Sequence, residues 1–244
     1  MMPFYTDYFN LLTNIFHLLM VYLPDGGGSY AETNTDYIIV EPWNAITSLF
    51  LIVPAIYLLV KLHQEGTYRQ HPFLLLCIPL LILGGLGSTF YHAFRAYPFF
   101  LYLDVVPTLL LTLAISAYFW YRVVKKGWLV AIIVVGALSL RIGLLYVLPP
   151  QLSINISYLI SGVVIFVPTV LILVATQFEQ SQKIILAALL LGVSLMFRRL
   201  DTELAYILPM GTHFLWHIFS AVGAFFLAEY LYFLDRQRIS LVAS

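Results

Sequence analysis

The chain has 244 residues, of which 61% are hydrophobic and only 10% are charged. Soluble domains carry about 25% charged and 45–50% apolar residues, so this composition excludes an ordinary soluble protein. Twelve Lys and Arg balance twelve Asp and Glu, which leaves no basic excess for binding nucleic acid, and the single cysteine, Cys77, excludes an intrachain disulfide framework.

The first 42 residues form an acidic lead-in without any Lys or Arg. An apolar stretch at residues 9–23 predicts a helix that lies at the membrane interface or packs on the rest of the protein, and three glycines at 26–28 break it. We therefore predict an extracytoplasmic segment over residues 1–42. A membrane domain over residues 43–234 and a short cytoplasmic tail over residues 235–244 complete the predicted organisation.

Seven later stretches are long enough to cross a bilayer, which takes about 20 apolar residues in a helix. They are continuous and lack two-residue alternation, so they indicate helices and not a transmembrane barrel. The predicted fold is an all-α, polytopic membrane protein with a seven-helix bundle. The predicted spans, of which the sixth is the shortest, are 43–62, 72–92, 99–122, 128–148, 156–177, 183–198 and 213–234.

The distribution of basic residues predicts the orientation, because loops on the cytoplasmic side carry an excess of Lys and Arg. The excess falls on the loops that share a side with the C-terminus. The N-terminus is therefore predicted outside and the C-terminus in the cytoplasm. The basic residues predicted on the cytoplasmic side are Lys61, Arg69, Arg122, Lys125, Lys126, Lys183, Arg236 and Arg238.

Three histidines share one predicted membrane depth, and ionisable residues within spans are candidates for function. His213 and His217 are four residues apart, which places both on one face of a helix. His92, at the end of the second span, is the natural third ligand of a site that holds a metal through three protein groups. The sequence predicts zinc here, and histidines that merely pack and hydrogen-bond are the alternative.

Two more polar residues lie at the same depth. Ser88 precedes His92 by one helical turn, and Asp104 lies near the start of the third span. The alternative for Ser88 is a hydrogen bond back to a helix carbonyl. The alternative for Asp104 is an ion pair with Arg95 or with Arg141.

The order Ser88-x3-His92, Asp104, His213-x3-His217 on seven spans resembles a superfamily that joins alkaline ceramidases, progestin/adiponectin-type receptors and hemolysin III-like proteins. The stretches at 31–34, 40–48, 199–201 and 211–217 are most similar to the alkaline ceramidases. The resemblance implies that His92, His213 and His217 hold zinc. It implies that Asp104 and Ser88 complete a site that hydrolyses the amide bond of ceramide.

The same resemblance implies a calcium site in the N-terminal segment, with Glu32, Asn34 and Glu41 as ligands. Calcium takes six to eight oxygen ligands. This sequence departs from the family, because Ser29 stands where the family has an aspartate and the gap between Asn34 and Glu41 is short. Asp36 is a further oxygen donor in this gap, and Ala31 replaces a cysteine that the family pairs in a disulfide.

Three functions follow as hypotheses. The first is a zinc-dependent hydrolase of ceramide or a related N-acyl lipid, in a bacterial inner membrane or an endoplasmic reticulum or Golgi membrane, with its site on the extracytoplasmic or luminal side. The second is a receptor or sensor of the progestin/adiponectin or hemolysin III type with structural zinc. The third is a channel or transporter, which predicts that the three histidines do not converge.

Overall fold

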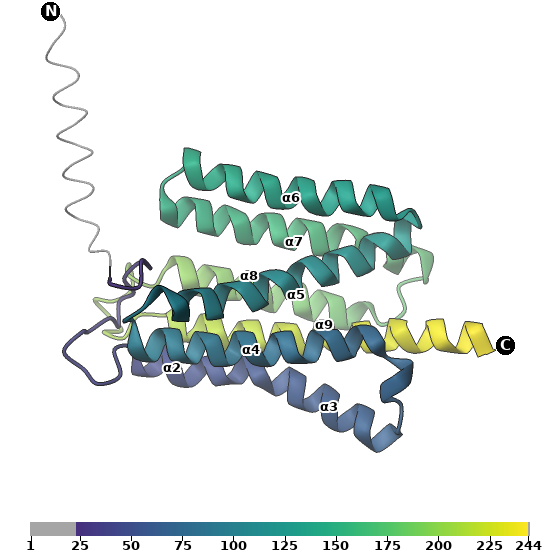
Figure 1. Ribbon diagram of the computed structural model, residues 1–244, viewed down its shortest axis with the longest axis horizontal. Coiled ribbons are helices and arrows are strands. Elements are labelled where there is room, and N and C mark those ends of the chain that lie inside the picture. Colours follow the sequence, from purple (N-terminus) through teal and green to yellow (C-terminus); the bar gives the residue numbers. More distant parts are fainter. Residues whose placement is uncertain (1–22, 244) are drawn as a thin grey trace, which may run out of the picture.

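The computed structural model describes residues 23–243, and the described chain is helical and without strands (Figure 1). All of the helix predicted at residues 9–23 except its last residue lies outside them. The elements in chain order are α2 (Pro42–Ser48), the 3-10 turn η1 (Leu49–Ile52), α3 (Val53–Glu65), the 3-10 turn η2 (Tyr68–Gln70), α4 (Pro72–Phe94), α5 (Pro98–Val124), α6 (Gly127–Val147), α7 (Pro150–Ala175), α8 (Ser181–Arg199) and α9 (His213–Ala243).

Among the described residues, seven helical stretches are long and apolar enough to cross a membrane. This confirms the predicted number of spans, including the short sixth span, which is α8. The first span consists of α2, η1 and α3 in continuous succession. The fifth span, α7, begins at Pro150 and ends at Ala175, so it starts six residues earlier than the predicted span at 156–177. Proline is well suited to the first position of a helix, where its missing N–H has no partner to lose, and this explains the early start.

The ends of α4 and α5 follow from local backbone chemistry. Pro72 and Pro98 start the two helices. Arg95 and Lys125 end them in the left-handed conformation, with φ of 47° and 56°. Such a φ is unusual for a residue other than glycine. The Arg95 side chain is buried in the ion pairs described below.

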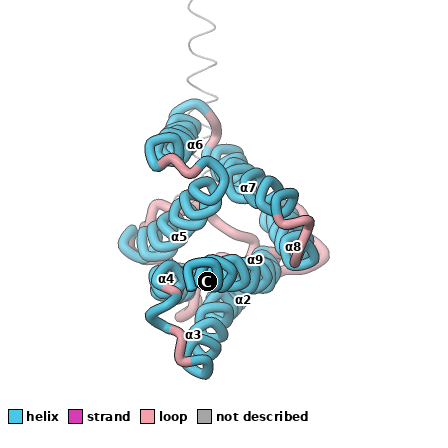
Figure 2. The backbone as a smooth tube through the Cα atoms, turned by 90° about the vertical axis from the view of Figure 1, so that its right-hand side faces the viewer, coloured by secondary structure: helices cyan, strands magenta, loops and turns pink. Residues whose placement is uncertain are grey.

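In the bundle, α2 and η1 pack against both α4 and α9 (Figure 2). On the other side, α4 packs on α5, α5 on α7, α7 on α8 and α8 on α9, while α6 packs against α5 and α7. The start of α2, the end of α4 and the start of α9 therefore meet at one end of the molecule. The C-terminus lies at the opposite end (Figure 1).

Small residues on α4 allow very close packing. A Cβ on Gly87 would lie 2.1 Å from the carbonyl oxygen of Leu103 on α5, and one on Gly84 would lie 2.7 Å from the Thr108 side chain. On another side of the same helix, a Cβ on Gly85 would lie 2.6 Å from Ile52 of η1. Glycine at these positions lets the backbones approach as they do at other membrane helix interfaces.

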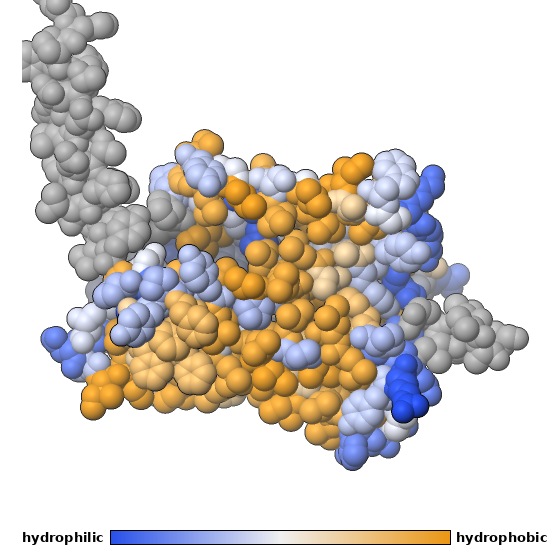
Figure 3. All heavy atoms as spheres, viewed as in Figure 1, coloured by the Kyte–Doolittle hydropathy of each residue, from blue (hydrophilic) through white to orange (hydrophobic). Residues whose placement is uncertain are grey.

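The apolar core and the polar interior lie toward different ends. Leu62, Leu74, Phe119 and Leu234 are fully buried in one apolar cluster near the C-terminal end. The buried polar side chains described in the next section gather at the end formed by α2, α4 and α9. Outside, a broad apolar band covers the side of the bundle and hydrophilic residues concentrate at its two ends, as expected for membrane helices (Figure 3).

Candidate metal centre

Two of the three histidines lie in the first turns of α9. The N-terminus of this helix is held by Asp201, whose carboxylate accepts hydrogen bonds from the backbone N–H groups of Thr212 and His213, each at 2.8 Å. The other carboxylate oxygen accepts the N–H of Ala31 at 2.9 Å, which ties the N-terminal segment to the same point. Asp201 thus caps the helix and fixes the start of the histidine pair.

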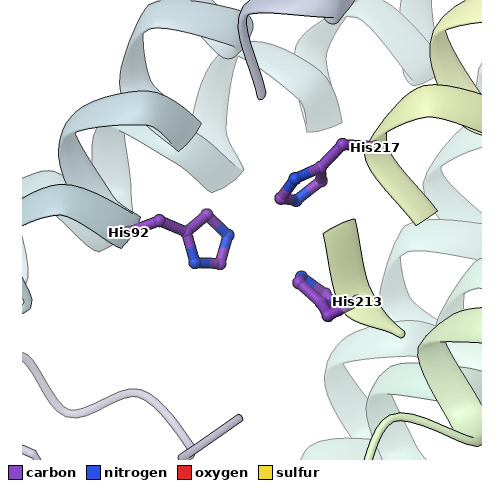
Figure 4. A group of neighbouring side chains, drawn as sticks. All are labelled: His92, His213 and His217. Atoms are coloured by element: carbon purple, nitrogen blue, oxygen red, sulfur yellow. The ribbon is translucent and has the colours of Figure 1, made fainter. Parts of the chain in front are cut away.

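His92 approaches from the last turn of α4 and faces the pair on α9 (Figure 4). Its ring centroid lies 5.3 Å from that of His213 and 4.9 Å from that of His217, and the two rings on α9 are 4.8 Å apart. Each histidine offers one nitrogen within 4.8 Å of the others. All three side chains are at most 2% exposed. The predicted convergence of the three histidines is confirmed.

The outer nitrogen of two rings has a partner that orients it. His92 donates from Nδ1 to the Glu41 carboxylate at 2.5 Å. His217 Nδ1 lies 3.1 Å from the Thr47 hydroxyl and 3.2 Å from the Ser48 hydroxyl. These hydroxyls also donate to the backbone carbonyls one turn back, at Trp43 and Asn44, so their oxygens are acceptors for the ring N–H. This pattern leaves Nε2 as the lone-pair atom of both rings, as metal-ligating histidines require.

His213 differs from the other two, because its Nδ1 is buried and has no hydrogen-bond partner among the described residues. Buried ring nitrogens are normally paired, and an unpaired one calls for an explanation. A bound cation would supply the missing partner. The donor set, three neutral imidazoles with two of them oriented from outside, therefore fits a divalent metal ion.

Ser88 and Asp104 lie beside the triad, as predicted. Ser88 is buried one turn before His92, with its Oγ 3.1 Å from Ser48 Oγ. The close contact at Gly87 brings the backbone of α5 next to this turn, and the half-buried Asp104 carboxylate lies beside the Ser88 hydroxyl. A hydroxyl and a carboxylate thus adjoin the three imidazoles.

The alternative for Asp104, an ion pair with Arg95, is not formed among the described residues. The Arg95 side chain is buried and pairs with Asp25, at 2.6 Å from Nε, and with the Glu41 carboxylate. Arg141 has no ion pair in the described part of the chain either. The N-terminal segment folds back over the end of α4 and binds the Arg95 side chain there. Arg95 also donates a hydrogen bond to the carbonyl of Gly28 in this segment, at 2.8 Å.

The Glu41 carboxylate therefore accepts a hydrogen bond from His92 and forms an ion pair with Arg95. Burial alone would raise the pKa of its carboxyl, but the hydrogen bond from His92 and the positive charge of Arg95 outweigh burial and lower it. The Glu41 side chain is fully buried, and Thr33 donates to it at 2.6 Å. A charged carboxylate is in this way fixed behind one histidine, the arrangement by which proteins orient metal-ligating imidazoles.

The side chains of the predicted calcium ligands form hydrogen bonds within the protein. Glu32 accepts the backbone N–H groups of Trp43 and Asn44 at the start of α2, and Asn34 accepts the N–H of Asp36. Among the described residues, the one group of three His, Cys, Asp or Glu side chains close enough to share an ion is the histidine triad. Calcium binding stays a prediction without a preformed site to support it.

Two side chains near the triad were not predicted. The Tyr30 ring lies 4.1 Å from the His213 ring and 5.2 Å from the His92 ring, between centroids. Its hydroxyl lies beside the Arg198 guanidinium, whose Nε is buried without a hydrogen-bond partner in the described chain. Arg198 is the last residue of the predicted sixth span and lies in the last turn of α8. The available sequence signal was its spacing of four from Ser194, a polar residue in an apolar run, which places both on one helix face. In the structure Ser194 is fully buried.

Comparisons with protein-family models and with curated proteins found no match to this chain.

Proposed function

We propose that this protein is a zinc-dependent membrane hydrolase of the alkaline ceramidase type, which cleaves the amide bond of ceramide or a related N-acyl lipid to a fatty acid and a sphingoid base. The observation that carries the proposal is the convergence of His92, His213 and His217, with His92 backed by a buried carboxylate. Three imidazoles without a thiolate are typical of catalytic zinc, which keeps its fourth position for water or substrate.

The residues around the triad have the functional groups that amide hydrolysis needs. Zinc held by the three imidazoles would supply a Lewis acid for the carbonyl and a water of lowered pKa. Asp104 accepts a proton from the attacking water and passes it to the leaving nitrogen as the C–N bond breaks. Ser88 donates a hydrogen bond to the oxygen on which negative charge develops. The water's oxygen ends in the fatty acid and its protons are divided between the products.

The position of the site in the bundle suits a lipid substrate. The triad lies among helices that present an apolar band outward, so the acyl chains can stay in the hydrocarbon while the amide reaches the polar interior. We further propose that this end of the bundle faces the outside or the lumen. The opposite end carries the basic residues that favour the cytoplasm, namely Lys61, Lys125, Lys126, Lys183 and Arg236.

The test combines metal content with lipid turnover in the purified full chain. We expect about one zinc per wild-type chain and its loss from a variant with alanine at His92, His213 and His217. His63→Ala is the matched control, because His63 is exposed in the last turn of α3, at the end of the bundle opposite the metal centre. Absence of zinc from folded wild-type protein would refute the proposal.

Turnover separates an enzyme from a receptor on the same scaffold. We expect release of fatty acid from ceramides of different chain length, measured by mass spectrometry of the lipid extract. Ser88→Ala and Asp104→Asn should retain zinc and lose turnover by 100-fold or more, roughly the contribution of a general base or an oxyanion donor. Zinc at full occupancy without any hydrolysis would instead favour the receptor hypothesis.

A further inference from the structure

The end of the bundle opposite the metal centre contains a polar pocket of about 390 Å³ between α3, α8 and α9. Its lining includes three basic side chains, Lys61, Lys183 and Arg236, and one acidic side chain, Glu229. From these observations we propose that the pocket binds the phosphate group of an anionic phospholipid.

The ion pairs in the pocket leave a positive charge. Glu229 pairs with Lys61 at 2.6 Å and with Lys183 at 3.0 Å, so one carboxylate faces two ammonium groups. Arg236 forms no ion pair among the described residues and instead lies 5.8 Å from the centroid of the Tyr232 ring. Three basic side chains and one acidic side chain therefore line the pocket itself, while Glu65 and Glu179 lie behind the lining residues Tyr232 and Gln237. A monoanionic ligand would reduce the imbalance within the lining.

Hydrogen-bond donors in the pocket also exceed the acceptors. The Lys61 ammonium donates to Glu229 and to the Tyr57 hydroxyl, and among the described residues the Lys183 ammonium donates to Glu229 alone. An ammonium has three N–H donors and a guanidinium has five. Both lysine side chains are only about a quarter exposed, at 23% and 27%, which limits their hydration. The unbridged oxygens of a phosphate diester are acceptors that match the remaining donors.

The place of the pocket identifies a lipid as the source of the phosphate. Lys61 lies in the last turns of α3, Lys183 in the first turn of α8 and Arg236 at the end of the apolar part of α9, so all three lie at the edge of the membrane-spanning region. Leu186, one turn from Lys183 on α8, is 40% exposed and continues the surface toward the apolar band. Basic pockets between helices at this depth are typical of lipid headgroup sites.

The test measures lipid affinity of the full-length protein in nanodiscs or by native mass spectrometry, with phosphatidylglycerol as the probe and phosphatidylcholine as the neutral comparison. We expect wild type to retain phosphatidylglycerol preferentially. In Lys183→Gln/Arg236→Gln, which keeps the Lys61–Glu229 pair, its affinity should fall about 30-fold, since each basic residue contributes ~1 kcal/mol toward an anionic lipid.

The matched control is Lys125→Gln/Lys126→Gln, which removes two positive charges from the same end but outside the pocket. It should retain the preference for phosphatidylglycerol. An equal loss in both double variants, or no preference in wild type, would overturn the proposal in favour of general surface attraction. If the pocket variant does not fold, Arg236→Gln alone tests the same point, because no described hydrogen bond is lost with it.

Inorganic phosphate is the third arm of the experiment. It should not compete with phosphatidylglycerol at millimolar concentration, because it cannot use the adjoining apolar surface. Complete competition would overturn the assignment to a lipid in favour of free phosphate. The readout is independent of hydrolysis and of zinc, so the lipid site and the proposed enzyme activity can fail separately.

Discussion

Replacing Glu41 by glutamine should weaken zinc binding even though Glu41 is not a proposed ligand. Glu41 accepts the Nδ1 proton of His92 at 2.5 Å and also pairs with Arg95, and both ion-pair side chains are fully buried. Loss of a group that orients a metal-ligating histidine typically lowers metal affinity 10–100-fold. Removing one partner of a buried ion pair also costs about 3–5 kcal/mol of stability.

Asp25→Asn is the matched control for this prediction. Asp25 pairs with the same arginine, at 2.6 Å, but no described contact joins it to a histidine. Both variants should therefore lower the thermal midpoint, whereas only Glu41→Gln should lower zinc affinity, measured by competition with a chromophoric chelator. Equal zinc affinities in the two variants would refute the argument that Glu41 acts through His92.

Three further predictions address packing, capping and the unpredicted arginine. Gly87→Ala should destabilise the protein by roughly 1–3 kcal/mol, because the new methyl group would lie 2.1 Å from the backbone of α5. Gly136→Ala, at a helical position with open space around it, should not lower the thermal midpoint, since alanine favours a helix over glycine. Asp201→Ala removes the cap of α9 and should lower the free energy of unfolding by about 0.5–2 kcal/mol. It should also weaken zinc binding measurably. An unchanged zinc affinity would show that packing alone holds the start of α9. Arg198 has a buried Nε without a partner among the described residues, so we expect it to donate a hydrogen bond to the substrate. Arg198→Met should then keep full zinc occupancy but lower kcat/KM about tenfold or more, because a hydrogen bond to a charged group is lost. Unchanged kinetics would exclude Arg198 from substrate binding.

The local features of the metal centre could be predicted from the sequence because each depends on spacing. Four residues separate His213 from His217, and four separate Ser88 from His92, so helical geometry alone places each pair on one face. Length and apolar content likewise predicted the spans, since about 20 residues are needed to cross a bilayer whatever the neighbours are. The start of α7 was predicted too late because the apolar run, and not Pro150, was used to locate it.

The partners of these side chains were decided by tertiary structure. Glu41 was predicted as a calcium ligand, but it lies behind His92 because α2 packs against both α4 and α9. An ion pair of Arg95 with Asp104 was the alternative that the sequence left open, but Arg95 pairs with Asp25 and Glu41 because the N-terminal segment folds over the end of α4. Spacing within one helix reports a residue's face and depth, but not which helix will be its neighbour. The contacts that orient the histidines join residues as many as 170 positions apart, as Thr47 and His217 are, and only the packing of the whole bundle brings such residues together.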